Sequence, residues 1–447
     1  MFDYKTPDVY VEEIPTLPPS ISGVSTAIPA FIGYTADDSL KLIPTRITSL
    51  LDFTTLFGGA APVNFSVTST ANDLTVSIAN DDTMQSHKLY YLLDLYFKNG
   101  GSDCYIVSLG AYAQKDINDF SNGIDALKTE DEPTLIILSE ATTLNRDEYY
   151  ALCQQALQQC ADLQDRFCIF DLLASPTLTS PPTDSVQDFR NNIGINNLSY
   201  GAAYYPYLIT TLNYIYDEQN VIITSTNPQS TLYDIKQSQP TLYNAVKQEL
   251  SKLKLILPPA SAIAGIYALT DRTRGVWKAP ANVSLNYVVG PTIKISSSAQ
   301  EDLNVDATGG KSINAIRSFT GKGILVWGAR TLDGSSNEWR YVPVRRLFIM
   351  IEESAKKASY FAVFEPNDAA TWLKVKGMIE SFLYGLWQQG ALAGPTSKAA
   401  YYVNVGLGTT MTQQDILEGR MIVEIGIAAV RPAEFVILRF SHKLQEA

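Results

Sequence analysis

Three apolar runs indicate the fold class: CYIVSL at residues 104–109, LIIL at 135–138 and FCIF at 167–170. Each run is short and apolar on both strand faces, which is typical of a strand buried between two layers. Helical patterns lie between the runs, over Phe120–Leu127 and Tyr149–Leu163. Because helices alternate with short apolar strands, the sequence predicts an α/β layer with a largely parallel sheet.

The alternation extends to both sides of these runs and indicates the middle of a multi-domain chain. Leu89–Lys98 is a predicted helix that ends at the glycine pair after it, and we assign residues 86–324 to an α/β middle domain. Residues 31–85 precede it, with a first apolar strand followed by a small β-rich insertion at the surface. The insertion is indicated by alternating polar and apolar residues within 58–83.

Residues 325–447 carry another pattern, which predicts an α+β C-terminal domain with a mixed sheet. Helices are expected over Arg345–Tyr360 and Trp372–Gln389, the second with apolar residues at i, i+3 and i+7. Strands are expected after the helices, over Tyr401–Val405, Met421–Val430 and Phe435–Phe440. The domain therefore ends in an arm strand close to the last residue.

Residues 1–30 are predicted to form an extended N-terminal arm. Their prolines exclude a continuous helix, and Val9–Glu12 alternates like a short strand. A strand without a local partner needs another strand for its backbone donors, either in this chain or in another chain. A disordered tail is the alternative, and the apolar residues of the segment argue against it.

Composition excludes several classes of protein. The 447-residue chain has a formal net charge of −12, which repels phosphate backbones, so we expect no nucleic-acid partner. Its 2 histidines lie far apart, which argues against a histidine-rich metal site or a triad. No apolar run reaches the length of a membrane helix, and residues 1–10 lack the pattern of a signal peptide. We expect synthesis in the cytosol and no membrane insertion.

No motif indicates catalysis, a cofactor or a metal. The 4 cysteines show no C-x-x-C spacing, and we interpret them as buried thiols. Thr308–Ser312 ends like a phosphate loop, but Val305 stands where that pattern needs glycine. A large chain without a site of this kind is expected to be a structural or assembly protein and not an enzyme.

The chain resembles contractile tail sheath proteins in stretches spread over nearly its whole length. These are TPDVYVEEI at 6–14, GVST at 23–26, IAGIYA at 263–268, DRTRGVWKAPAN at 271–282, LN at 303–304, GILVWGART at 323–331, VRRL at 344–347, FEPN at 364–367 and RPAEF at 431–435. The nearest relatives are expected among myophage tails and extracellular contractile injection systems.

The resemblance implies a function and partners. Family sheaths surround an inner tube as stacked hexameric rings, and their contraction drives the tube through a target envelope. It implies a subtilisin-like fold for the middle domain, without a protease triad. The implied partners are the chain itself, the inner tube, and baseplate and terminal cap proteins. The particle could be a virion, or a cytoplasmic, anchored or released system. Alternatives are another self-assembling tube or shell protein and a cytosolic α/β hydrolase.

The arms are the first candidate assembly site. We expect an inter-subunit arm strand at Val9, Tyr10, Val11 and Glu12. Its expected partner is the C-terminal strand of a neighbouring subunit, either receiving or donated, at Phe435, Val436, Ile437, Leu438, Arg439 and Phe440. The alternative is that each arm folds back on its own subunit.

The second candidate site is a tube-facing helix, because family sheaths contact the tube through a helix of the C-terminal domain. Our candidate carries Arg345, Arg346, Glu352, Glu353, Lys356 and Lys357. The competing helix is Trp372–Gln389, with Lys374 and Lys376. The other possibility is that the arginines pair with Glu352, Glu353 or other acids inside the subunit, leaving the lysines in solvent.

Overall fold

The computed structural model describes residues 21–69, 74–78, 86–173, 183–224, 229–435 and 437. These residues form two units: a large unit, Val24–Glu352 with 431–435 and 437, and a small unit, Glu353–Val430 with 21–23. The division falls after Glu352, whereas the sequence pattern predicts a boundary at residue 325. The reason is that the strand over 323–326 belongs to the main sheet of the large unit.

That main sheet has nine strands among the described residues. Its order is β13 (Val283–Ser284), β16 (Gly323–Val326), β15 (Asn314–Phe319), β8 (Gly201–Tyr205), β7 (Phe167–Asp171), β6 (Leu135–Ile137), β1 (Pro29–Thr35), β5 (Cys104–Ala111) and β2 (Thr45–Ile47). The strands from β15 to β5 run parallel, and β2, β16 and β13 add antiparallel edges. The three apolar runs are the strands β5, β6 and β7, all of which have a neighbouring strand on both sides.

Helices cover both faces of the sheet. They are α1 (Leu50–Phe57), α2 (Leu89–Lys98), α3 (Ile117–Ala126), α4 (Arg146–Leu163), α5 (Thr183–Asn192), α8 (Ala260–Arg274) and α9 (Ser297–Asn304). Phe31 of β1 packs on Tyr96 of α2, with ring centroids 5.2 Å apart. Its neighbour Ile32 faces Gly123 of α3. Because side chains alternate along a strand, α2 and α3 lie on opposite faces.

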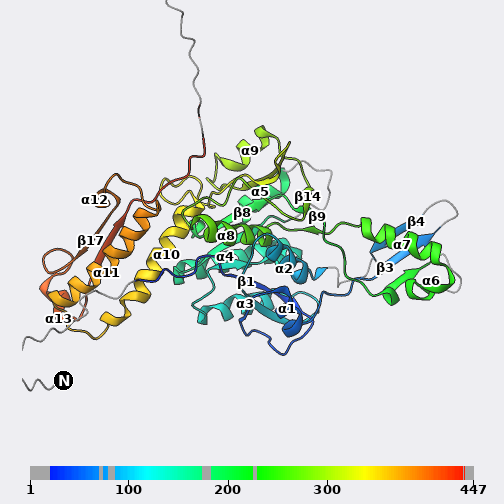
Figure 1. Cartoon of the computed structure of the whole chain (residues 1–447), viewed down its shortest axis with the longest axis horizontal. Coiled ribbons are helices and arrows are strands. Elements are labelled where there is room, and N and C mark those ends of the chain that lie inside the picture. Colours follow the sequence, from blue (N-terminus) through cyan, green and yellow to red (C-terminus); the bar gives the residue numbers. More distant parts are fainter. Residues whose placement is uncertain are drawn as a thin grey trace, which may run out of the picture. The chain divides into compact units, whose positions relative to one another are not determined.

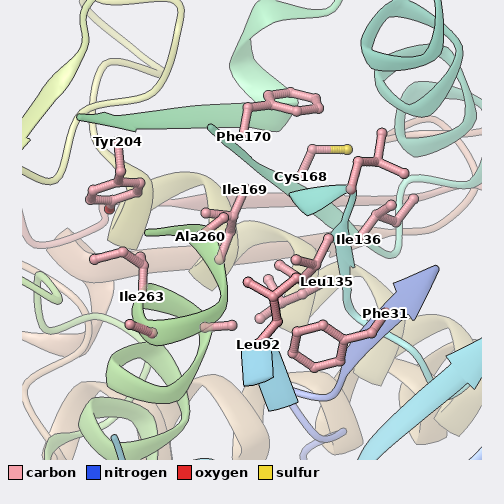
Figure 2. Close-up of a cluster of buried hydrophobic side chains, with 14 of the residues drawn as sticks. Phe31, Leu92, Leu135, Ile136, Cys168, Ile169, Phe170, Tyr204, Ala260 and Ile263 are labelled. Atoms are coloured by element: carbon pink, nitrogen blue, oxygen red, sulfur yellow. The ribbon is translucent and has the colours of Figure 1, made fainter. Parts of the chain in front are cut away.

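The core of the large unit lies between the sheet and these helices. Figure 2 shows Leu135 of β6 and Ile169 of β7 on the side of Leu92 of α2 and Ile263 of α8, whereas Ile136 and Cys168 point to the other face of the sheet. The cysteines Cys104, Cys153, Cys160 and Cys168 are all buried free thiols, which confirms their interpretation. Two-sided burial explains why the strands are apolar throughout and not alternating.

The β-rich insertion is larger than expected, because two distant segments build it. Its sheet has the order β11 (Ser230–Thr231), β10 (Val221–Ile223), β3 (Phe65–Ser69) and β4 (Leu74–Ile78), packed with α6 (Leu232–Ser238) and α7 (Pro240–Lys252). Figure 1 shows β3 and β4 beside α6 and α7, and their apolar residues form a separate core. The β3–β4 hairpin was expected; its pairing with β10 was not.

A further small sheet in the large unit has the order β12 (Ile256–Leu257), β9 (Leu208–Thr210) and β14 (Val288–Pro291). The helix α10 (Val342–Ala358) begins in the large unit and ends in the small one. The small unit continues with α11 (Ala369–Gln388), α12 (Ser397–Ala400), β17 (Tyr401–Val405), α13 (Gln413–Leu417) and β18 (Val423–Ile427). β17 and β18 pair antiparallel in register from Tyr401 opposite Ile427 to Val405 opposite Val423.

Candidate assembly site

Arg346 of α10 lies in a buried cluster with the first part of the described chain. Its Nη2 donates to Asp271 Oδ2 at 2.6 Å and to the Thr26 carbonyl at 2.8 Å, and its Nη1 donates to Asp271 Oδ1 at 3.1 Å. The guanidinium lies 4.6 Å from the centre of the Tyr267 ring. The Thr26 hydroxyl also donates to Asp271. We name Thr26, Tyr267, Asp271 and Arg346 the N-root cluster.

Arg345 is held in an aromatic box. Its guanidinium lies 4.2 Å from the centre of the Tyr200 ring and 4.5 Å from that of Trp339. Nη2 donates to the Tyr200 hydroxyl at 2.6 Å and lies 3.5 Å from Glu352 Oε2. Arg345 and Arg346 are only 5% and 3% exposed. These two arginines therefore present no charge to a partner, and the intramolecular alternative holds for both of them.

The rest of the proposed tube-facing helix lies further along α10. Glu353 is buried, and its carboxylate lies 3.3 Å from the ammonium groups of both Lys356 and Lys357. Glu352 and Lys356 are exposed, and Lys357 is partly exposed. Contact with a tube stays a prediction. It now depends on Glu352, Lys356 and Lys357, because the buried arginines cannot contribute.

Glu434 joins three segments that lie far away in the sequence. Arg330 Nη2 donates to Oε2 at 2.6 Å and Nε to Oε1 at 2.9 Å, so the pair is bidentate. Asn304 Nδ2 donates to Oε1 at 2.9 Å and the Tyr341 hydroxyl to Oε2 at 3.2 Å. We name Asn304, Arg330, Tyr341 and Glu434 the C-root cluster. Neither cluster was predicted from the sequence, although their charged members lie within the quoted family stretches.

The electrostatics of the C-root cluster favour the ion pair. The Arg330 side chain is 7% exposed and that of Glu434 is 22% exposed. Burial of Glu434 opposes its ionisation, but the bonds from Arg330 and Asn304 outweigh burial and hold the pKa of this carboxyl below its usual value. Charge-assisted bidentate pairs of this kind are strong and directional.

The predicted arm strands are only partly described. Val9, Tyr10, Val11 and Glu12 lie outside the described residues, as do Val436, Leu438, Arg439 and Phe440. Phe435 and Ile437 are described, lie outside the regular strands, and are 70% and 76% exposed. Two large apolar side chains thus follow the C-root cluster directly and remain in solvent in the single chain.

The β17–β18 pair offers edges to further strands. Ala428 N–H donates to the Ala400 carbonyl at 2.8 Å, one residue beyond the pair of Tyr401 and Ile427 at the end of the ladder. Since antiparallel pairs alternate, the backbone groups of Tyr402 and Gly426 face each other, and those of Val403 and Ile425 point outward. Among the described residues, the sheet holds only these two strands. An outward row of donors and acceptors is what an added strand pairs with.

Two further buried charged groups of the large unit, Lys311 and Glu140, are bonded inside the fold. Lys311 is buried and donates its ammonium to the Arg190 carbonyl near the end of α5, so the segment that resembles a phosphate loop folds as a turn. Glu140 is buried with His87 Nδ1 at 3.3 Å and Lys115 Nζ at 3.6 Å. No group of three or more possible metal ligands occurs among the described residues. In the same part of the chain, no helix is long and apolar enough to cross a membrane.

Comparison with known proteins identifies the family. Residues 335–443 match the phage tail sheath C-terminal domain family. The chain is similar over 100% of its length to a chain of the PVC sheath complex of an extracellular contractile injection system in its contracted state, with 31% identity, 99% of that chain covered and a TM-score of 0.67. It is similar over 99% to a chain of the six-fold symmetrised anti-feeding prophage baseplate, with 33% identity, 100% of that chain covered and a TM-score of 0.66.

A curated relative is the tail sheath protein of Vibrio phage KVP40, which is 26% identical over 136 residues. The alignment covers 30% of this chain and 20% of the phage protein, so the chain spans about a fifth of that relative. Full-length similarity above 30% identity to the injection-system chains is decisive. The chain belongs to the contractile sheath proteins of phage tails and phage-tail-like injection systems, which are structural proteins and not enzymes.

Proposed function

We propose that this chain polymerises as stacked six-fold rings around an inner tube, and that contraction of the polymer drives the tube through a target envelope. The observation that carries the proposal is the match over the whole chain to a sheath complex in its contracted state. Baseplate and terminal cap proteins are the proposed partners at the two ends of the polymer, and assembly begins after synthesis in the bacterial cytoplasm.

The contacts between subunits are proposed to use the arms. Val9–Glu12 and Phe435–Phe440 are the candidate exchanged strands, which meet on a neighbouring subunit. The two outward edges of β17–β18 offer one place for each arm. The exposure of Phe435 and Ile437 supports this assignment, because large apolar side chains at such positions gain most from being covered by a partner. Backbone pairing also tolerates a change of angle between subunits during contraction.

The contact with the tube is proposed to be weak and polar. Lys356, Lys357 and Glu352 remain as candidates on α10, with Lys374 and Lys376 of α11 as the competing set. Exposed ion pairs contribute about 0–1 kcal/mol each, so they can be broken together when the sheath contracts.

Negative-stain microscopy of the chain expressed alone tests the assembly proposal. We expect hollow cylinders from the full chain and a folded monomer from a variant that lacks residues 1–20. The matched control replaces residues 1–20 by a glycine–serine segment of equal length, which separates the sequence of the arm from its length. Cylinders of normal appearance from either variant would contradict the role of the N-terminal arm.

A further inference from the structure

Thr26 and Glu434, which lie near the two ends of the described chain, are both bonded within the large unit, and each has one partner at the beginning of α10. Tyr341 precedes α10 directly and donates to Glu434, while Arg346 in the first turns of α10 donates to Thr26. The chain leaves the large unit after Glu352 and returns to it at Arg431. The two root clusters therefore attach the starts of both proposed arms to one unit.

At the C-terminal root, the bonds that the structure gives between residues 431–435 and the rest of the large unit are those of the Glu434 side chain. Ala433 and Phe435, on either side of Glu434, are exposed. The receiving site is organised by contacts that do not involve the arm: Arg330 Nη1 donates to the Asn304 carbonyl at 3.0 Å, and Arg330 N–H donates to Asn314 Oδ1 at 2.8 Å. The guanidinium is thus already oriented toward the place where the Glu434 carboxylate lies.

We propose that Glu434 is a positioning residue for the C-terminal arm: its carboxylate fixes the register and direction in which residues 435–447 leave the large unit, and so transmits displacement between subunits. This inference rests on the proposed function, because it assumes that the arm reaches a neighbour. A bidentate pair suits this task better than an apolar contact, since its two parallel bonds define an orientation.

A slipped C-terminal segment would bring a different side chain to Arg330. A shift by two residues keeps the side chain on the same face of an extended segment, and would place Pro432 or Val436 opposite the guanidinium. Neither can accept a hydrogen bond through its side chain. Arg330, at 7% side-chain exposure, would then be left as a buried charge without its carboxylate, which disfavours the slipped registers.

Glu434→Gln in the full chain tests the proposal, with Glu301→Gln as control. Glu301 is an exposed carboxylate on α9, the helix that also carries Asn304. The glutamine keeps the shape of the side chain and removes its charge. We expect the backbone N–H groups of Ala433, Glu434 and Phe435 to lose order in the unassembled chain, measured as a fall of their heteronuclear NOE toward the values of a free chain end, with an unchanged melting temperature. We also expect fewer and shorter cylinders by microscopy, and partial recovery in Glu434→Asp.

The possible outcomes separate this proposal from the proposed function. Unchanged NOE values in Glu434→Gln overturn the positioning role, and so do lowered values with normal cylinders. Lowered values with defective cylinders, beside normal behaviour of Glu301→Gln, support it. A chain that lacks residues 436–447 tests the arm itself. If that chain assembles normally, the proposed strand exchange by the C-terminal arm is wrong, while the NOE measurement at Glu434 still reports on the ion pair.

Discussion

Gly33 lies in β1 where this strand passes a buried carboxylate. Glu140 is held there by the Tyr34 backbone N–H, which donates to Oε2 at 2.9 Å, and by the ion pairs with His87 and Lys115. A Cβ atom added at Gly33 would overlap Glu140 Oε2. The glycine is therefore required by the close approach of a charged group that cannot move away from its partners.

We expect Gly33→Ala to lower the free energy of unfolding by roughly 3 kcal/mol or more, because it displaces a buried, paired charge. Gly385→Ala is the matched control in α11, where an added Cβ meets no atom within 4 Å. Alanine there should raise the free energy of unfolding by about 0.5–1 kcal/mol through helix propensity. Urea unfolding measures both changes. Equal effects of the two substitutions would contradict this account of Gly33.

Asp171 at the end of β7 should make stability depend on pH. It accepts hydrogen bonds from Ser139 and from the Ala260 N–H at the start of α8. Burial outweighs these bonds and raises the pKa of Asp171 from 3.8 to about 7. The folded state therefore holds a proton that the unfolded state loses. The stability from this proton is complete below about pH 4 and is lost as the pH rises to about 7.

The comparison of Asp171→Asn with the parent chain isolates this effect. Between pH 4 and 7 the parent should lose up to about 1.4 kcal/mol of unfolding free energy per pH unit from this group, and the variant should not. The difference between the two unfolding curves removes the contributions of all other titrating groups. Parallel pH profiles of the two proteins would show that Asp171 does not titrate in this range.

The β17–β18 pair is an element that is incomplete by itself. Two strands are marginal without further partners, and the outward backbone groups of both strands remain available among the described residues. Its pleat also separates the two faces, with Val403 buried and Tyr402 exposed. The same alternation separates backbone donors that hold the pair together from donors that point outward.

Proline substitutions can distinguish these two sets of donors. At Val423 or Val405, which form the last pair of the register, proline removes an outward N–H and no bond of the ladder. We expect folded monomers that no longer form cylinders. At the adjacent Glu424 the N–H faces Asn404, so proline should lower the melting temperature of the monomer. Normal cylinders from both valine variants would exclude these edges as assembly surfaces.

For the whole molecule, contraction must draw its energy from contacts between subunits if no nucleotide is used. The one segment that resembles a phosphate loop is a turn, with Lys311 bonded inside the fold. We expect calorimetry of extended particles to show an exothermic, irreversible transition without added nucleotide. Additional aromatic contacts after contraction are the proposed source of the heat. A strict requirement for ATP during contraction would contradict this view.

Local signals were sufficient for much of the fold. The helix over Leu89–Lys98 and the strand over Tyr401–Val405 have the expected bounds, because apolar periodicity and glycine stops act within a few residues. Burial of β5, β6 and β7 on both faces could be inferred from their short apolar runs. The lack of a catalytic motif and the resemblance to the sheath family could also be seen in the sequence.

Only the tertiary structure decided where the charges of α10 point. Arg345 and Arg346 have the sequence pattern of an exposed basic turn, yet Asp271, Thr26 and Tyr200 reach them from distant segments. In the same way, the pairing of β3 with β10 and of Glu434 with Arg330 joins residues more than a hundred positions apart. Local patterns carry no information about such pairs, because their free energy depends on how packing of the whole unit brings the partners together.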